Sequence, residues 1–392
     1  MLRSLYSGIS GLRSHQTMLD VTGNNIANVN TTGFKASSVQ FQDTLSQMTQ
    51  GAGGPQAQAG GTNPAQVGLG VQVAGISTNF TQGSSQATGK ATDMMISGDG
   101  FFVTSKGGEQ FYTRAGAFEL DSNGNLVSPD GAILQGWMAD AAGNIPVGGP
   151  INTIQLSPAT VSAASATTTA KVSGNLPSEA ADPDAPLVRD IEIFGADGTK
   201  STLQLTFDKT ANPGEWVVTG GGGTATVTFD ANGALAAASD TSIVSGGITV
   251  DLATLTGYAG MSTVKLDSQN GYAAGALESF TMASDGTLMG SFSNGRQAAV
   301  GRIALANFTN PGGLEKAGSS SYRVTANSGQ VELGTAGTGG LGTLAGGSLE
   351  MSNVDLSQEF TNLIVAQRGF QANARIITTS DEVLQELTNL KR

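Results

Sequence analysis

Apolar residues at both ends of the chain recur at intervals of seven residues. Near the N-terminus the interval joins Leu5, Leu12, Leu19 and Ile26, while Leu2 and Ile9 form an offset series. Near the C-terminus it joins Leu356, Leu363, Phe370, Ile377 and Leu384, with Phe360, Ala374 and Leu387 beside them. A strict seven-residue interval places an apolar seam on a helix and favours supercoiling against a second helix. The pattern therefore predicts two terminal helices that form a coiled coil, and two amphipathic helices packed on an ordinary core are the alternative.

Residues 22–35, TGNNIANVNTTGFK, form a polar connector after the first helix. Asparagine readily bonds local backbone groups and tolerates left-handed geometry. Four asparagines are therefore expected to close the helix and shape the exit from it: Asn24, Asn25, Asn28 and Asn30. Gly33 is expected to form the turn. Phe34, Ile26 and Val29 are expected to anchor the connector on the β domain or on neighbouring chains, so the stretch is interpreted as a mechanical connector.

The second helix needs a cap at its start. Ser352 and Asn353 precede the C-terminal apolar run, and both residue types favour the N-cap position. One of these two residues is therefore the expected N-cap.

Between the helices the pattern changes to an alternation of apolar and polar residues, which is typical of half-buried strands. The alternation is clearest in RDIEIFG, STLQLTFD, TATVTFD and GGITVDLATL. Asn-Gly and Asp-Gly pairs favour type I′ hairpin turns, whose central residues both need positive φ. Such pairs stand at 123–124, 130–131, 197–198, 232–233 and 285–286. The predicted fold class is mixed and mainly β, with terminal α-helices in a coiled-coil-like inner domain and two nested antiparallel β domains.

Composition divides the chain into nested parts. Residues 46–66 are rich in Gly, Gln, Ala and Pro and carry no charge, which is typical of a long linker. Small-residue sequence at 156–186 is expected to lead into an inserted domain, and 266–280 to lead out of it. The predicted parts are a terminal helical domain (1–45 with 353–392), the linker (46–66), a discontinuous middle β domain (67–150 with 275–352) and an inserted outer β domain (151–274).

Composition also limits the available chemistry. The 392 residues include no cysteine and one histidine, which excludes disulfides, thiolate nucleophiles and sites with several histidines. A net charge of −12 with scattered basic residues argues against nucleic-acid binding. No apolar run reaches the length of about 18 residues that a membrane span needs. The opening lacks the apolar core of a Sec-type signal peptide, so a protein that works outside the cell would need another export route.

No stretch gives a positive signal for catalysis. The one histidine, His15, lies inside the first heptad run, where packing at a seam or exposure is expected. Residues 121–130 resemble a calcium loop, but Leu126 and Ala132 stand where that pattern needs glycine and an acidic ligand. The glycine-rich 219–223 lacks the lysine of a phosphate loop, and no carboxylate pair has a favourable spacing. No catalytic, cofactor-binding or metal-binding residue, no cofactor and no small-molecule substrate are predicted, and the chain is not expected to be an enzyme.

One pair of terminal helices leaves long apolar seams incompletely covered, because helices gain most of their stability from packing. Copies of the same chain are the simplest partners for such seams. The candidate polymerisation residues are Leu5, Ile9, Leu12, Leu19, Ile26, Leu356, Phe360, Leu363, Phe370, Ile377 and Leu384. A secreted adhesin or enzyme with helical ends is the alternative class.

Two terminal stretches resemble the signatures of the bacterial flagellar axial proteins, the family of rod, hook and hook-associated proteins. They are LYSGISGLRSHQTMLDVTGNNIANVNTTGFK and LEMSNVDLSQEFTNLIVAQRGFQANARIITTSDEVLQELTNL. Between them, DMMISGDGFFVTS and VGRIALANFTNPGGLEKAGSSSYRVTANSG resemble the β domain of that family. The resemblance covers nearly the whole chain apart from 150–265. Length and the inserted domain resemble hook proteins more than distal rod proteins, whereas the long 46–66 segment is similar to one in the distal rod.

The resemblance to hook proteins implies a tubular helical polymer that joins motor to filament and acts as a universal joint. It implies export through the flagellar type III apparatus, without a cleaved signal peptide, to the extracellular flagellum. The implied partners are other copies of the chain, the distal rod, the hook cap and the hook–filament junction proteins. A distal rod subunit is the alternative within the family.

Overall fold

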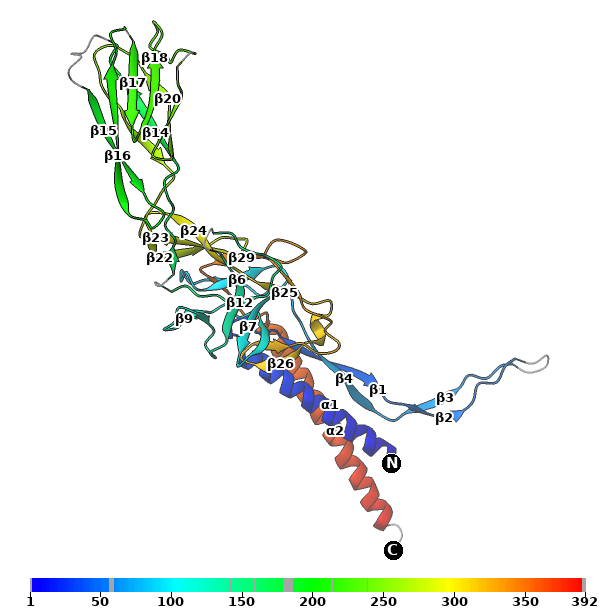
Figure 1. Ribbon diagram of the computed structural model, residues 1–392. Helices are drawn as coiled ribbons and strands as arrows, with labels where there is room; N and C mark the ends of the chain where they lie inside the picture. Colours follow the sequence, from blue (N-terminus) through cyan, green and yellow to red (C-terminus); the bar gives the residue numbers. More distant parts are fainter. Residues whose placement is uncertain are drawn as a thin grey trace.

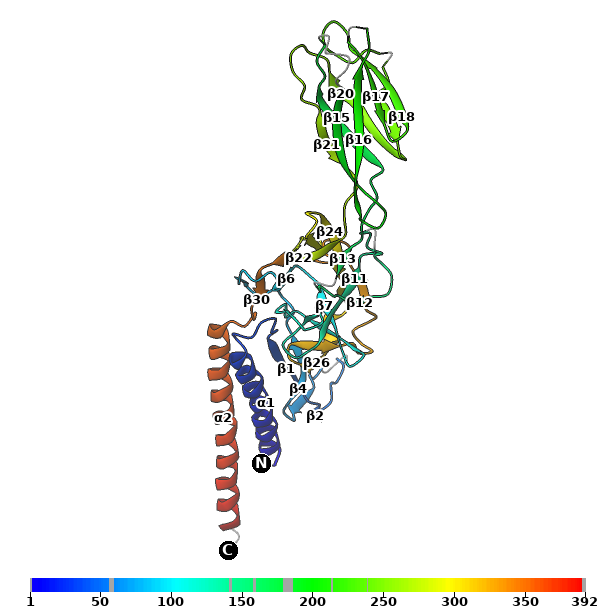
Figure 2. The same ribbon diagram turned by 60° about the vertical axis from the view of Figure 1, so that its left-hand side comes forward.

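The computed structural model describes residues 2–55, 60–140, 143–157, 160–178, 186–212, 214–237 and 239–389. These residues form an elongated molecule with paired helices at one end, a middle β domain, and an outer β domain at the other end (Figures 1 and 2). A narrow β arm projects sideways from the junction between the helices and the middle domain (Figure 1). The predicted class, mainly β with a helix at each end, is confirmed.

Both predicted helices are present and lie side by side. Helix α1 spans Leu2–Ala27 and α2 spans Leu356–Asn389, so α2 is the longer, with 34 residues against 26. The helices run antiparallel, and the C-terminal part of α2 extends past the start of α1 (Figure 2). The extension leaves the last turns of α2 without cover from α1.

Asp355 caps α2, so the prediction of Ser352 or Asn353 is wrong. Asp355 Oδ1 accepts hydrogen bonds from the backbone N–H groups of Ser357 at 2.8 Å and Gln358 at 3.4 Å. The side chain of Asn353 is instead bonded to the middle domain, and the helix begins after it.

The middle domain is built on one large sheet. Its strands follow the order β13-β22-β23-β24-β11-β7-β8-β27-β26. Off this path, β10 and β12 pair with β11, β9 with β10, β25 with β7, and β28 with β25. Two separate two-stranded sheets, β5 with β30 and β6 with β29, complete the domain. The first chain segment supplies β5 (Ser85–Ala87), β6 (Met94–Ser97), β7 (Phe101–Lys106), β8 (Glu109–Thr113), β9 (Glu119–Leu120), β10 (Leu126–Val127), β11 (Ile133–Met138), β12 (Asn152–Thr153) and β13 (Val161–Ser162). The returning segment supplies β22 (Gly275–Met282), β23 (Thr287–Phe292), β24 (Gln297–Ile303), β25 (Leu305–Asn307), the 3₁₀ turn η1 (Pro311–Gly313), β26 (Glu315–Gly318), β27 (Ser321–Arg323), β28 (Glu332–Gly334), β29 (Thr343–Gly346) and β30 (Ser348–Glu350).

Both chain segments contribute to a shared core in this domain. Phe102 and Leu134 from the first segment pack with Leu288 and Ile303 from the second, and all four side chains are fully buried. Strands β12 and β13 also pair into this sheet, although the sequence assigned their residues to the inserted domain. These strands are two residues long and rich in small polar residues, so they carry no alternation that a sequence pattern could detect.

The outer domain consists of two four-stranded sheets that share one core. One sheet has the order β15-β16-β17-β18 and the other β19-β20-β14-β21. Their bounds are β14 (Thr169–Asn175), β15 (Leu187–Phe194), β16 (Lys200–Lys209), β17 (Glu215–Gly220), β18 (Gly223–Thr228), β19 (Ser242–Ser245), β20 (Ile248–Thr256) and β21 (Lys265–Gln269). The prediction of purely antiparallel pairing is wrong at one place, because β14 and β20 pair in parallel. Alternation identifies a half-buried strand but not the direction of its neighbour.

The arm is a long two-stranded ribbon. Strand β1 (Ser37–Asp43) pairs with β4 (Val71–Thr78), and further out β2 (Ser46–Gln50) pairs with β3 (Ala65–Gly68). The segment 46–66, which the composition marked as a linker, therefore contains paired strands. Its Gln- and Gly-rich sequence lacks the alternation that predicts strands, and its role as a linker stays a prediction.

The Asn-Gly and Asp-Gly turns differ from the predicted type I′ geometry. At residues 121–125, Gly124 has φ of 81°, but Asn123 is not among the residues with positive φ. Asp121 Oδ1 instead accepts the N–H groups of Asn123 and Asn125, each at 2.8 Å, so an aspartate at the start of the turn organises it. Among the described residues other than glycine, positive φ occurs at Ser319 and Ser320, in the turn between β26 and β27.

Candidate functional site: the helix pair and its junction with the middle domain

The fully buried positions of α1 are small and polar residues rather than leucine. The buried positions of α1 are Gly8, Gly11, Ser14, Thr22 and Asn25. A Cβ atom on Gly11 would lie 2.7 Å from Asn373 Oδ1, and one on Gly369 of α2 would lie 2.5 Å from the His15 ring. Glycine therefore permits the close approach of the two helices, and His15 is a packing residue of this interface.

The predicted seam residues are covered only in part by the opposite helix. The half-buried members are Leu5, Ile9, Leu12, Leu19, Ile26, Leu363, Phe370, Ile377 and Leu384. Leu356 and Phe360, at the start of α2, are exposed. One chain thus leaves much of its own seam open.

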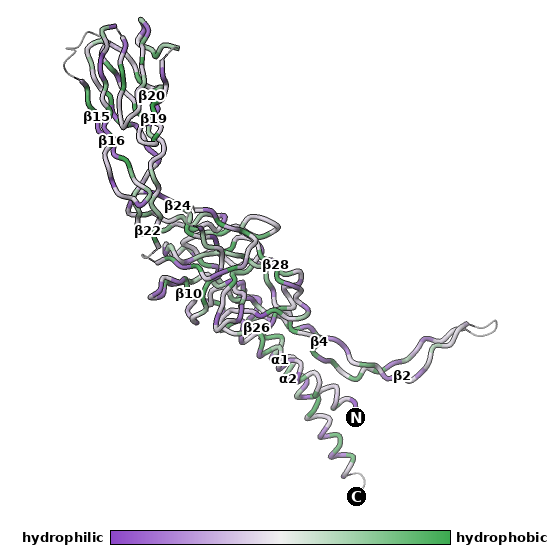
Figure 3. The backbone as a smooth tube through the Cα atoms, in the orientation of Figure 1, coloured by the Kyte–Doolittle hydropathy of each residue, from purple (hydrophilic) through white to green (hydrophobic). Residues whose placement is uncertain are grey.

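Helix α2 also carries large apolar side chains that face solvent. Phe360 is 52% exposed and Ile364 is 56% exposed. The remaining exposed members are Leu356, Val365, Ile376, Val383 and Leu387. Apolar residues recur along α2, including its end beyond α1 (Figure 3). An exposed apolar surface of this kind marks an interaction site.

Asn25 joins three elements at the end of α1. Its Nδ2 donates to the Ser37 carbonyl at 2.8 Å and to Glu359 Oε1 at 3.0 Å, while its Oδ1 accepts the Ser37 N–H at 3.0 Å. The side chain is 1% exposed. Asn25 therefore links α1 to the start of the arm and to the first turn of α2, a longer reach than the local backbone bonds expected from the sequence.

The other connector residues act more locally. Asn28 Nδ2 donates to the Asn24 carbonyl at 2.9 Å, which closes the last turn of α1. Asn24 and Asn30 are exposed. Phe34 lies under Lys316 of β26, whose Nζ is 5.2 Å from the ring centroid.

Gly33 occupies a position that only glycine fits. Its φ is 66°, and a Cβ atom there would lie 2.4 Å from the Ala115 backbone nitrogen. Its N–H donates to the Glu350 carbonyl at 2.8 Å. The turn therefore brings the connector directly against the strand that precedes α2.

A buried ion cluster, made of Lys35, Glu350 and Arg114, lies beside this turn. Lys35 Nζ is 2.6 Å from Glu350 Oε1, and Arg114 Nη1 is 3.5 Å from Glu350 Oε2. The Lys35 and Glu350 side chains are 0% exposed and that of Arg114 is 2% exposed. Lys35 also donates to the Thr81 carbonyl at 2.7 Å. The cluster joins the segments that lead to both helices.

Burial dominates the electrostatics of this cluster. It lowers the pKa of Lys35 below its ordinary value, although the hydrogen bond and charge of Glu350 oppose the change. Burial lowers the pKa of Arg114 in the same way, again against the charge of Glu350. The sequence does not predict the cluster, because Lys35 and Glu350 stand 315 positions apart and nothing in the stretches that contain them indicates that they pair.

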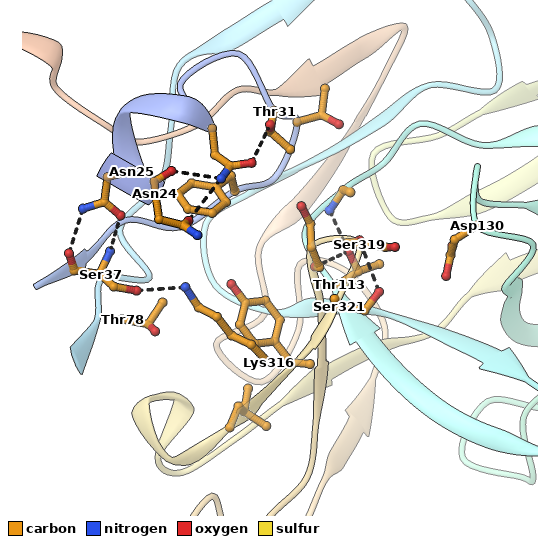
Figure 4. A pocket seen from close by; sticks show the side chains of 18 of the residues that line it. Asn24, Asn25, Thr31, Ser37, Thr78, Thr113, Asp130, Lys316, Ser319 and Ser321 are labelled. Carbon is orange, nitrogen blue, oxygen red and sulfur yellow. Dashed lines mark hydrogen bonds between the residues drawn. The ribbon is translucent and has the colours of Figure 1, made fainter. Parts of the chain in front are cut away.

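A groove of about 970 Å³ opens beside the connector (Figure 4). Its wall includes hydroxyl and amide groups of Asn24 and Thr31 from the connector and of Thr113 from the middle domain. Apolar and charged side chains also line it, among them Leu314, Asp130 and Lys316. Within the described part of the chain, no three His, Asp or Glu side chains gather as a metal site would require. The groove thus combines hydrogen-bonding, charged and apolar side chains.

Three family models match successive parts of the chain. The model described as Flagella basal body rod protein matches residues 5–35, and Flagellar hook protein FlgE/F/G D1 domain matches 95–173. Flagellar basal body rod FlgEFG protein C-terminal matches 345–390. The matches thus fall on both terminal helices and on the middle domain with the first strands beyond it.

The chain is also similar to curated proteins along its whole length. It is 42% identical to flagellar hook protein FlgE of Borreliella burgdorferi over 442 aligned positions, and 40% identical to that of Treponema pallidum over 470. It is 35% identical to flagellar basal-body rod protein FlgG of Bacillus subtilis over 393 positions. Each alignment covers 100% of both chains.

Paired terminal helices, nested β domains and these matches define an axial protein of the flagellar rod and hook. Within that class the chain belongs to the flagellar hook protein family, and it is a structural subunit of the hook. Its place in the cell is the hook and basal body region of the flagellum. Among the described helices, neither has the length and apolar character needed to cross a membrane.

Proposed function

We propose that copies of this chain assemble into a helical tube in which the terminal helices form the inner layer. The observation that carries the proposal is the exposed apolar surface of α2, with Phe360 and Ile364 more than half exposed. Burial of such a side chain stabilises an assembly by roughly 1.5–3 kcal/mol when it is complete. Several residues per subunit, repeated along a polymer, supply enough free energy for a stable tube.

The arm is a second surface for contact between copies. The arm exposes Phe41, Leu45, Met48, Val67 and Ile76 to solvent. A two-stranded ribbon is marginally stable by itself, so contact with other subunits would stabilise it. Deletion of 46–66 is expected to change the curvature or stability of the tube more than the export of the subunit.

The remaining layers suit a tube that bends as a universal joint while it transmits torque. The middle domain has a closely packed core and would form a stiff shell. The outer domain lies far from the helices, where bending produces the largest displacement between neighbours (Figure 2). Small polar residues on its surface permit sliding contacts.

The proposed partners are other copies of this chain, the distal rod, the hook cap and the hook–filament junction proteins. We further propose an extracellular position reached through the flagellar type III export apparatus, without a cleaved signal peptide. We propose a structural role without catalysis, which the similarity to flagellar hook proteins supports. A distal rod subunit is the second candidate, because of the full-length similarity to the rod protein FlgG.

The test places a charge on the exposed face of α2. Phe360→Asp and Ile364→Asp are expected to raise the critical concentration for salt-induced assembly at least tenfold, which corresponds to about 1.4 kcal/mol per contact. Both side chains are exposed in the single chain, so circular dichroism of the monomer should stay unchanged. Electron microscopy and sedimentation would measure tube formation.

Ala372→Asp is the matched control, because Ala372 is an exposed small residue on the same helix and buries little apolar area. It should assemble at close to the parent concentration. Normal tubes from both Phe360→Asp and Ile364→Asp would contradict the proposed inner layer. Parent protein that stays monomeric in every assembly condition would instead favour the adhesin or enzyme alternative.

A further inference from the structure

The outer domain is connected to the middle domain through a narrow neck formed by residues 163–168 and 270–274 (Figures 1 and 2). The first segment consists entirely of Ala, Ser and Thr. In the second, Tyr272 stands among Gly271, Ala273 and Ala274. Side chains this small pack little area against either domain, so few contacts fix the angle between the domains.

The two neck segments are joined to each other by a pair of backbone hydrogen bonds. The Ser165 N–H donates to the Tyr272 carbonyl and the Tyr272 N–H donates to the Ser165 carbonyl, both at 3.0 Å. This pair of hydrogen bonds, called the Ser165–Tyr272 rung below, lies between the two domains. On one side is the pairing of β13 with β22 at the end of the middle domain, and on the other is β14, the first strand of the outer domain.

The neck is firmly attached on its outer side. Thr167 donates its N–H to the Phe194 carbonyl and accepts the Phe194 N–H on its Oγ1, both at 2.9 Å. Gly198, in the turn between β15 and β16, lies so close that a Cβ there would approach the Ala164 Cβ to 2.9 Å. The neck and the outer domain therefore move as one body.

On its inner side the neck is held by the turn between β23 and β24. The Arg296 guanidinium lies over the Tyr272 ring, 4.1 Å from its centroid, and Asn294 Nδ2 donates to the Ala273 carbonyl at 2.8 Å. One hydrogen bond allows rotation about its axis, whereas a planar guanidinium stacked on a ring resists rotation. The stack is thus the contact that resists a change of angle.

We propose that the stack of Arg296 on Tyr272 is a brace that sets the resting angle of the outer domain. Release of the brace lets the Ser165–Tyr272 rung swing with the outer domain about the junction of β13 and β22. The stack is partly exposed to solvent, so it breaks and re-forms without unfolding either domain. Its use in a bending tube rests on the proposed function; the brace itself is a property of the single chain.

The test measures the distribution of distances between the two domains in the monomer. The chain has no cysteine, so Ala231→Cys in the outer domain and Gln330→Cys in the middle domain give two unique sites for spin labels. Electron–electron double resonance on this background should give one narrow distribution. Arg296→Ala is expected to broaden it at least twofold, and Tyr272→Ala should do the same.

Two controls distinguish a brace from general loosening. Tyr272→Phe keeps the ring and should keep the narrow distribution. Arg302→Ala removes an arginine from β24, the strand that follows the turn of Arg296. Arg302 pairs with Asp285 away from the neck, so this variant should also leave the width unchanged. A distribution for Arg296→Ala as narrow as that of the parent, or a parent distribution already as broad as the variant, would overturn the proposal. Neither result depends on assembly, so failure of the brace and failure of the proposed function are distinguishable.

Discussion

The two ends of the middle domain are attached to their neighbours in opposite ways. At the base, the end of the middle domain that faces the helices, the segments that connect to both helices meet in the buried ion cluster of Lys35, Glu350 and Arg114. At the neck, Tyr272 and Arg296 form a partly exposed stack over segments of small residues. Removal of a buried partner leaves an unpaired charge, whereas an exposed stack exchanges with water at small cost.

This difference makes the base the stiff attachment of the middle domain and the neck the flexible one. The base holds the helices in one orientation. In any other orientation a buried charge, or a buried amide such as that of Asn25, would lose its hydrogen-bond partner. At the neck, release of the proposed brace of Arg296 on Tyr272 would let the outer domain change its angle without exposing a buried charge. A subunit built in this way can keep its inner contacts fixed while its outer part moves.

The largest effect is expected from Glu350→Gln, which removes the one anion of the buried ion cluster. Lys35 and Arg114 would then be buried beside each other without the charge of Glu350, which should lower the free energy of unfolding of the middle domain by about 3 kcal/mol or more. Trp137 lies in this domain and Trp216 in the outer one. Urea unfolding followed by Trp137 fluorescence in a Trp216→Phe background would measure the loss.

Two variants check that the effect comes from charge burial. Glu332→Gln removes an exposed glutamate and should change the free energy of unfolding by no more than about 0.5 kcal/mol. Lys35→Met leaves Glu350 paired with Arg114, so it should cost less than Glu350→Gln. Equal stability of Glu350→Gln and the parent would mean that the base is not held by its charges.

Gly33→Ala is expected to have the next largest effect. A Cβ at this residue meets the Ala115 backbone, and an L side chain is strained at a φ of 66°. The variant should lose about 2 kcal/mol of unfolding free energy, measured by the same fluorescence experiment. Gly54→Ala is the control, because a Cβ there has open space around it. A neutral Gly33→Ala would show that the connector can move away from the middle domain.

The sequence predicts the helices and the β class because both rest on local periodicity. The interval of seven marks α1 and α2, and alternation marks strands such as β16 and β20. The glycine at residue 33 is also predictable, since its turn is a local requirement of the chain. Each of these features can be read within a window of about one element.

Features that depend on distant partners could not be predicted in this way. Helix contact through Gly11 and Gly369 depends on how two helices meet, and a heptad pattern of leucines indicates a different face. The pairing of Lys35 with Glu350 depends on the return of the chain after the inserted domain. The parallel pair of β14 and β20 depends on topology, which alternation does not encode.

Tyr322→Phe is expected to change the response of the base to alkali. Tyr322 is 3% exposed, and burial raises the pKa of its phenol, although the charge of Arg114 opposes the change. Because the pKa of the folded state lies above that of the unfolded state, this group favours folding below pH 10 and loses that contribution as pH rises further. Between pH 9 and pH 11 the free energy of unfolding of the parent should therefore fall by about 1.4 kcal/mol more than that of the variant. If the free energies of unfolding of parent and variant, measured by urea unfolding, change equally with pH across this range, the prediction is contradicted.

The smallest effect on stability is expected at the neck, from Arg296→Ala. A cation stacked on an exposed ring contributes about 0.5–1 kcal/mol. The free energy of unfolding of either domain, measured in urea, should therefore change by less than about 1 kcal/mol. Trp137 and Trp216 report the two domains, so both transitions can be followed in one protein. A loss as large as that of Glu350→Gln would make the neck a part of the core and remove the contrast with the base. A small loss combined with a broadened distance distribution would show that orientation and stability are set by different contacts. Only that combination leaves a subunit free to change the angle of its outer domain while its base remains folded.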